Sequence, residues 1–386
     1  MVERRQIVEL ARSSGGIAGV LVTLVRAEGS SYRRPGARLL TGAAANAPGN
    51  VATYAGTISG GCLEAEVVKK AVWKVRAGAV VDRYSTLFDD TAEIPYGLGC
   101  GGTIDLLLEP AGTPEFHALI DAFEASLSGE RFTVLTWLPA AGRVLQRAVI
   151  SSSGEPVFRS PGLDTAKIDA ALLAQNPDDP DIYIEQLSPP QRLLILGAGD
   201  DAKPVVSMAA LLGWSVTVAD GRPQLARAER FPAAEQVLVA TASELHALRI
   251  SADDAVVLMT HSYEQDRDWL AAVLPLAPRY LGVLGARHRS SLLVSEAAAM
   301  IALPVAECCA RIYAPVGLDL GGDGPEAIAL AIIAEAQARS TGRLPSSRRL
   351  SAQDVAEQIE QGGASRYLQA QCALDLAPGE LEWGER

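Results

Sequence analysis

Two cysteines of this 386-residue sequence lie in glycine-rich stretches, where a thiol can meet a ligand. Cys62 stands in ISGGCLEAE, and Cys100 stands in GLGCGGTID. Small neighbours allow close approach to the backbone, and a predicted helix N-terminus at Cys62 favours a thiolate, although Glu64 opposes it. Two such thiols suit a soft metal or a metal–sulfur centre, but neither CxxC spacing nor a histidine pair specifies which metal. The alternative is that each is a small buried residue.

A basic turn precedes both stretches. In SSYRRPGAR, three arginines and two serines surround a Pro-Gly turn. Arg33, Arg34 and Arg38 can therefore hold a phosphate or a carboxylate. The alternative is an ordinary solvated hairpin turn.

A second kind of glycine turn follows the apolar strand LLIL. The stretch LLILGAGDDA, with Gly197 and Gly199, is followed by SVTVAD, which ends at Asp220. This strand–turn–helix–strand pattern is typical of a dinucleotide fold, in which the turn meets phosphate and the acid meets the ribose. Asp200 and Asp201 oppose an anion there, so the alternative is a nucleotide fold whose pyrophosphate site is lost or altered.

Two further residues follow predicted strands of the same region. His261 comes directly after DAVVLMT, and Arg222 comes just after SVTVAD. Ligands of open α/β sheets bind beyond the carboxyl ends of the strands, so we take both residues as candidate cofactor-binding residues, together with Gly197, Gly199 and Asp220. A hydrogen-bonded structural histidine is the alternative for His261.

The surrounding patterns predict two domains. Residues 1–150 indicate a smaller N-terminal α+β domain, and residues 151–190 indicate a linker that contains one short helix. Residues 191–343 alternate apolar strands with helices, which predicts an α/β fold with a Rossmann-like parallel sheet and helices on both faces. Residues 344–386 are expected to be a polar tail with a short helix.

Composition narrows the functional classes. The net charge of −12 argues against nucleic-acid and anionic-membrane partners. No stretch has the composition of a transmembrane helix or a signal peptide, and five cysteines are not a disulfide framework. We therefore expect a cytoplasmic protein.

Several motifs in this order resemble one family. They are SYRRPGARLL, GTISGGCLEAEV, GLGCGGTIDLLLEP, LGAGDDAKPV, GWSVTVADGRP, VVLMTHSYEQD, YLGVLGARHR and PVGLDLGGDGPEAIALAIIAEAQA. Across roughly residues 10–343, the chain resembles the XdhC/CoxF family of xanthine and carbon-monoxide dehydrogenase maturation factors.

The resemblance implies a cofactor-binding chaperone rather than a catalyst. Such a protein binds molybdenum cofactor (molybdopterin) transiently while a cysteine desulfurase adds its sulfido ligand, and then delivers it to an apo molybdenum hydroxylase. The resemblance makes Cys62 and Cys100 candidate cofactor- or sulfur-handling thiols, and the three arginines candidates for the cofactor phosphate. The glycines beside the thiols join the cofactor-binding candidates: Gly60, Gly61, Gly99 and Gly101.

Two alternatives remain open at this point. One is an oxidoreductase that uses NAD(P), or another nucleotide, in the Rossmann-like domain, since Asp220 favours NAD. The other is a partner-binding scaffold with a vestigial nucleotide fold. We also expect a homo-oligomer, because a small β-rich unit has sheet edges to cover.

Overall fold

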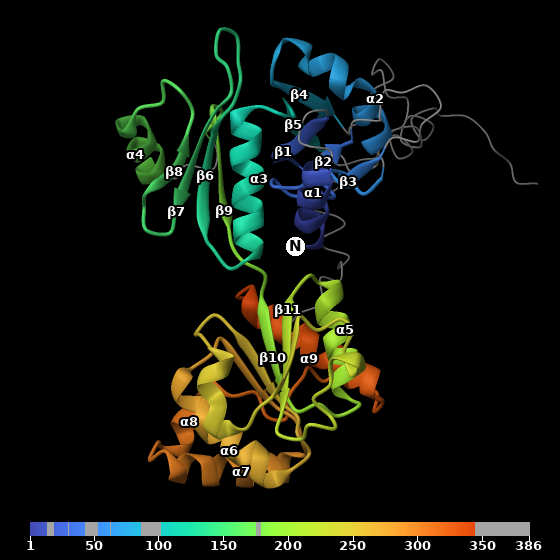
Figure 1. Cartoon of the computed structure of the whole chain (residues 1–386), viewed down its shortest axis with the longest axis vertical. Helices are drawn as coiled ribbons and strands as arrows, with labels where there is room; N and C mark the ends of the chain where they lie inside the picture. The colour runs from blue at the N-terminus through green and yellow to red at the C-terminus, as the bar shows by residue number, and fades with distance from the viewer. Residues whose placement is uncertain are drawn as a thin grey trace, which may run out of the picture. The chain divides into compact units, whose positions relative to one another are not determined.

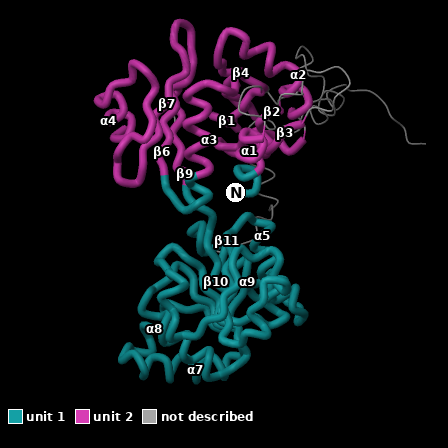
Figure 2. The backbone as a smooth tube through the Cα atoms, viewed as in Figure 1, with its two compact units in different colours: residues 1–5, 125–131, 188–346 teal, residues 6–124, 132–187, 347–386 magenta. Residues whose placement is uncertain are grey.

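The computed structural model describes residues 1–13, 19–29, 31–42, 53–61, 63–85, 102–174 and 179–343. These residues form two compact units, which Figure 2 colours separately. Unit 1 comprises residues 1–5 and 125–131 and the described residues from Ser188 onward. Unit 2 comprises the described residues of 6–124 and 132–187. The predicted polar tail, 344–386, lies outside the described residues.

Unit 1 is built on a five-stranded parallel sheet in the order β12-β11-β10-β13-β14 (Figure 1). The strands are β10 (Arg192–Leu196), β11 (Ser215–Asp220), β12 (Gln236–Val239), β13 (Ala255–Leu258) and β14 (Tyr280–Val283). The chain runs outward from β10 to β12 and then returns to the other side of β10 at β13. The strand order therefore reverses between β10 and β13, which is where sheets of this type bind ligands.

Helices cover both faces of this sheet because successive strand residues point to opposite sides. Leu193 and Ile195 pack in a core with α5 (Ala202–Leu211) and α9 (Pro325–Ser340). Leu194 and Leu196 pack in a second core with α6 (Tyr263–Val273) and α7 (Arg287–Met300), and α8 (Val305–Arg311) follows α7. The predicted Rossmann-like architecture is confirmed.

Unit 2 contains a five-stranded antiparallel sheet in the order β3-β2-β1-β5-β4. Its strands are β1 (Val20–Glu28), β2 (Arg38–Thr41), β3 (Tyr54–Gly56), β4 (Val80–Ser85) and β5 (Thr103–Pro110). The central strand β1 is buried over its first six residues. Val67 and Ala71 of α2 (Glu64–Lys74) pack in the same core as β1 and β5. This sheet confirms the predicted N-terminal α+β unit, which also includes most of α1 (Val2–Ser13) and α3 (Pro114–Leu127).

A second sheet of unit 2 overturns the predicted linker over 151–190. Its strand order is β8-β7-β6-β9, with β6 (Phe132–Trp137), β7 (Gln146–Ser151), β8 (Pro156–Arg159) and β9 (Ile182–Leu187). The strand β9 pairs with β6 along its whole length, and α4 (Thr165–Ala174) buries Ile168 and Ala171 in the core of this sheet. The turn-forming residues of 151–190 therefore join paired strands.

Within the described ranges, no single helix is both long and apolar enough to cross a membrane. The helices α7 and α8 reach the required length and composition only as a pair. They are bent by 117° relative to each other.

Candidate functional site

The turn before α2 encloses the carboxylate of Glu64. Both oxygens of this carboxylate accept hydrogen bonds from the turn, including the hydroxyl groups of Thr57 and Ser59. Five backbone N–H groups also donate to it at 2.8–3.2 Å: those of Ile58, Ser59, Gly60, Gly61 and Leu63. These seven donors exceed the roughly four lone-pair sites of a carboxylate, and two of them are shared: the N–H groups of Gly60 and Leu63 also donate to the hydroxyl oxygens of Thr57 and Ser59.

Glu64 is therefore a buried carboxylate that the turn surrounds with hydrogen-bond donors. Glu64 is only 2% exposed. Burial by itself raises the pKa of this carboxyl, but the hydrogen bonds from Ser59, Thr57 and the backbone outweigh it and lower the pKa to about 2. The carboxylate is thus charged at neutral pH, and the turn is folded around it.

The basic turn lies beside the glycine turn within unit 2. Gly60 and Gly61 adopt φ values of +86° and +113°. A Cβ atom on Gly60 would lie 2.6 Å from Cε1 of Tyr32, so the aromatic ring packs directly against this glycine. Tyr32 is nevertheless 73% exposed. Two motifs that are separate in sequence are thereby brought together, and Tyr32, which residue type alone did not single out, joins them.

The three candidate arginines have different environments. Arg33 is half-buried and Arg34 is exposed, directly after Tyr32. Arg38 is 7% exposed, forms an ion pair with Glu185 and lies over the ring of Phe123 at 4.8 Å from its centroid. Its guanidinium is therefore committed to the interior of unit 2, and the prediction that Arg38 holds a cofactor phosphate is wrong.

Four other predicted site residues of the N-terminal region lie outside the described residues: Cys62, Cys100, Gly99 and Gly101. The chain on either side of Cys62 is described, however. Gly61 and Leu63 both donate their N–H groups to Oε2 of Glu64. Two cysteines elsewhere are described as free thiols, the buried Cys308 and the exposed Cys309.

In unit 1, the turn after β10 requires glycine for steric reasons. Gly197 has a φ of +129°, and a Cβ atom there would lie 2.3 Å from the carbonyl oxygen of Met259, just after β13. The turn therefore passes very close to the backbone of the neighbouring strand, at the point where the strand order reverses. The helix α5 starts at Ala202 and contains Pro204, because proline is tolerated in a first helical turn.

The acid predicted to bind ribose is occupied by the protein itself. Asp220 is fully buried and accepts hydrogen bonds from the N–H of Ala198 at 2.8 Å and from two guanidinium nitrogens of Arg222 at 2.9 and 2.7 Å. Burial acts to raise the pKa of Asp220, but these bonds lower it below its ordinary value. Arg222 also donates to the carbonyl of Thr260 at 3.0 Å, across the reversal point. In this arrangement neither residue is available to a nucleotide.

His261 pairs with one of the two acids of the same turn. Its Nε2 lies 2.8 Å from Oδ2 of Asp201, and its backbone φ is +60°, which is uncommon for a residue with a side chain. Asp200 instead pairs with Lys203 and Arg230 at 2.7 and 2.8 Å. The two acids thus have separate partners, and only His261 among the predicted residues presents a largely exposed side chain here.

Asp266 and Arg289 are two residues at this edge that sequence reasoning missed. Asp266 is fully buried and accepts from the backbone N–H and hydroxyl of Thr260, at 3.1 and 2.7 Å. Its other oxygen accepts from Arg289 at 2.6 Å. Arg287, at the start of α7, is exposed, whereas the helical phase turns Arg289 inward. An acid in the first turn of the helix after β13 and an arginine in the first turn of the helix after β14 were the available signals.

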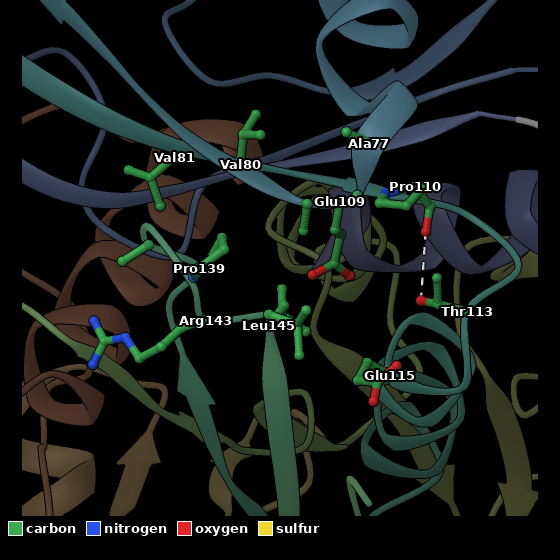
Figure 3. Close-up of a pocket in the computed structure, with 14 residues that line it drawn as sticks. Ala77, Val80, Val81, Glu109, Pro110, Thr113, Glu115, Pro139, Arg143 and Leu145 are labelled. Carbon is green, nitrogen blue, oxygen red and sulfur yellow. Dashed lines mark hydrogen bonds between the residues drawn. The ribbon is translucent and has the colours of Figure 1, made fainter.

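A cavity of about 590 Å³ lies elsewhere in unit 2 (Figure 3). Its lining is mainly apolar, with the carboxylates of Glu109 and Glu115 at one side, and Figure 3 shows the guanidinium of Arg143 pointing away from them. Both oxygens of Glu109 accept from Arg147 at 3.1 and 2.7 Å, in an ion pair whose side chains are each 2% exposed. None of the residues selected from the sequence lines this cavity.

Comparison with known proteins assigns the chain to a family. The model of the XdhC Rossmann domain matches residues 193–336, and the model of the XdhC and CoxI family matches residues 13–85. The two matches together span more than half of the chain, which belongs to the XdhC family. The resemblance noted from the motifs is confirmed.

Three individual proteins are similar over most of their length. A probable xanthine dehydrogenase subunit of Bacillus subtilis is 27% identical over 319 residues, which cover 82% of this chain and 91% of that protein. The molybdenum cofactor insertion chaperone PaoD of Escherichia coli is 25% identical over 322 residues, or 83% of each chain. A crystal structure of a xanthine dehydrogenase from Bacillus halodurans has a TM-score of 0.74 and 28% identity, covering 92% of this chain and 99% of that one.

Proposed function

We propose that this chain is an accessory factor of molybdenum hydroxylases. In this proposal it binds molybdenum cofactor and delivers it to an apo-enzyme of the xanthine or carbon-monoxide dehydrogenase type. Membership of the XdhC family and similarity to a molybdenum cofactor insertion chaperone support an accessory role. The proposed further partners are a cysteine desulfurase and a second copy of this chain, and the proposed location is the cytoplasm.

The observation that carries the proposal is the contact between the basic turn and the glycine turn. Because Tyr32 packs against Gly60, the chain that bears Arg33 and Arg34 lies beside the chain that leads into Cys62. The cargo has an anionic phosphate and a soft dithiolene–molybdenum centre. Arginine suits the first group and thiolate suits the second, so the two motifs that this contact joins contain both residue types.

Within this proposal each residue type has a separate task. Arg33 and Arg34 bind the phosphate, while Cys62 and Cys100 contact the dithiolene–molybdenum centre. Gly99 and Gly101 allow the cargo to approach the backbone beside Cys100. Gly60 and Gly61 contribute shape rather than N–H donors, because those donors are already bonded to Glu64.

NAD(P) is not part of the proposal. The carboxylate that would accept the ribose hydroxyls, that of Asp220, is buried and paired with Arg222. The N–H of Ala198 in the glycine turn donates to the same carboxylate.

The test is to produce the chain in cells with an intact molybdenum pathway and to measure pterin fluorescence after oxidation of the purified protein. We expect the wild-type protein to retain molybdopterin and the variants Cys62→Ala and Cys100→Ala to lose most of it. Cys309→Ala is the matched control, since Cys309 is an exposed thiol of unit 1. A wild-type protein with no bound pterin and no affinity for added cofactor would contradict the proposal.

A further inference from the structure

We propose that Glu64 is a positioning residue for the cofactor-binding turn, acting as an internal anion that holds the chain on both sides of Cys62. The inference rests on the proposed function, because it assigns a purpose to the geometry of a turn that carries a proposed cofactor ligand. Glu64 itself does not touch the cargo in this proposal.

Glu64 is surrounded by an unusual number of hydrogen-bond donors from the turn. Five N–H groups and two hydroxyl groups, spread from Thr57 to Leu63, converge on one carboxylate. Any turn with so many N–H groups pointing inward has a strong positive potential and needs an anion. Glu64 supplies that anion from the first residue of α2, where a negative charge is also favoured by the helix dipole.

The hydrogen bonds to Glu64 leave the turn closed to other anions. The N–H groups of Gly60 and Gly61 point at Glu64 and not outward. The phosphate of a bound cofactor therefore has to find its donors elsewhere, and the proposal assigns Arg33 and Arg34, which follow the Tyr32 that packs against Gly60. The turn then serves to fix a backbone path, and the arginines serve to bind charge.

Glu64 also holds the backbone on the two sides of residue 62. Residues 61 and 63 donate to the same oxygen, Oε2, at 2.9 and 3.2 Å. The backbone entering and leaving residue 62 is thus anchored at two neighbouring points. A ligand held on an anchored backbone loses less conformational entropy when it binds its target.

The experiment compares Glu64→Ala and Glu64→Gln with the wild-type chain. Glu64→Gln keeps the size of the side chain but replaces one acceptor by a donor, which faces other donors. We expect molybdopterin retention to fall about tenfold in both variants, corresponding to about 1.4 kcal/mol. We also expect the amide protons of residues 58, 59 and 61 to exchange with solvent at least about tenfold faster in Glu64→Ala, because each loses its acceptor, whereas the N–H of Leu63 keeps the hydroxyl oxygen of Ser59 at 2.8 Å.

A matched control and a rescue separate positioning from a general loss of stability. Asp105→Asn removes another buried carboxylate of unit 2, one that pairs with Arg26 at 3.2 Å, and it is expected to leave retention and exchange of the turn unchanged. Acetate, a small carboxylate, is expected to restore slow exchange and retention to Glu64→Ala but not to Glu64→Gln, in which the side chain still fills the site. Inorganic phosphate is expected to bind Glu64→Ala and not the wild-type turn.

The outcomes distinguish this inference from the function on which it rests. Unchanged amide exchange in Glu64→Ala, or retention equal to that of the wild type, would overturn the positioning role. A wild-type protein that holds no molybdopterin, together with acetate-dependent protection in Glu64→Ala, would overturn the proposed function while supporting the role of Glu64 in fixing the turn.

Discussion

The two glycine turns of this protein look alike in sequence but differ in how their backbone donors are satisfied. In unit 1, the N–H of Ala198 donates to Asp220, which comes from the end of a neighbouring strand and is paired with Arg222. In unit 2, the donors surround Glu64, which comes from the helix that follows the turn and whose described partners are N–H and hydroxyl groups.

The comparison teaches that a glycine turn before a helix is not by itself a ligand site. Both turns have the N–H groups and the helix that bind anions in nucleotide-binding folds. In both, the protein supplies a carboxylate of its own, which occupies N–H groups that would otherwise bind an external anion. What remains different is the surroundings: exposed Tyr32 and Arg34 lie beside the turn of unit 2, whereas the cations beside the turn of unit 1 are paired with acids.

The largest expected effect comes from substituting one glycine in each turn. Gly197→Ala places a Cβ atom 2.3 Å from a backbone oxygen of Met259 and is expected to destabilise unit 1 by more than about 4 kcal/mol. Gly61→Ala meets nothing within 4 Å and is expected to cost about 1–3 kcal/mol, from its φ of +113° alone. Urea unfolding followed by hydrogen exchange in each unit measures both values. Equal losses would mean that the two turns are constrained in the same way.

Acid should reveal the charge buried in the turn of unit 2. Because the pKa of Glu64 is about 2 in the folded chain, below its ordinary 4.5, its contribution to stability is fully present above pH 4.5 and is lost as the pH falls toward 2. That contribution is about 3 kcal/mol at neutral pH. The difference in unfolding free energy between the wild type and Glu64→Gln, measured from pH 7 to pH 2, is expected to shrink by this amount. A difference that stays constant with pH would contradict the assignment.

The corresponding change in unit 1 should be smaller. Asp220→Asn keeps one acceptor oxygen for Arg222, which also donates to the carbonyl of Thr260, but it turns the other oxygen into a donor that faces Ala198 or Arg222. The substitution is expected to cost about 2 kcal/mol. The guanidinium is partly exposed and so regains some solvation. Chemical denaturation measures the free energy of unfolding of Asp220→Asn and Glu64→Gln side by side. A larger loss of stability in Asp220→Asn would contradict the expectation that the carboxylate in the turn of unit 2 contributes more.

The smallest expected effect is that of NADH on the wild-type protein. Titration is expected to give no saturable change in nucleotide fluorescence, because Asp220 and Arg222 already bond to each other. Saturable binding would mean that this ion pair opens for a nucleotide, and the contrast between the two turns would then fail in unit 1.

The strands of the parallel sheet were predictable because they are short, continuous apolar runs such as LLIL and AVVL. The second sheet of unit 2 was not predictable in the same way. Strand β8 is mostly exposed and β9 is mostly half-buried, so neither has a clear apolar pattern, and the Ser, Gly, Pro and Asp residues between them resemble a linker. Pairing decided their conformation: β8 pairs with β7 in a local hairpin, and β9 pairs with the distant strand β6.

The candidate site shows a similar limit. Residue type and spacing selected the glycines, the arginines and Asp220. They did not reveal which of these groups the protein uses internally, because that depends on the folded backbone, whether the partner is as near as Arg222 is to Asp220 or far away in sequence. Arg38 is buried by Glu185, which is 147 residues later. Glu64 was read as opposing a thiolate, but its seven donors depend on the backbone path of the turn and not on residue type alone.

The measurement that tests the central claim most directly is the molybdopterin content of two double variants purified beside the wild type. One is Arg33→Ala/Arg34→Ala, beside the turn of unit 2, and the other is Lys203→Ala/Arg230→Ala, beside the turn of unit 1. We expect the first to retain about tenfold less molybdopterin than the wild type, because two charge-assisted contacts to a phosphate are lost. We expect the second to retain the wild-type amount. Loss in the second variant with full retention in the first would place the cargo on the Rossmann-like unit and contradict the account.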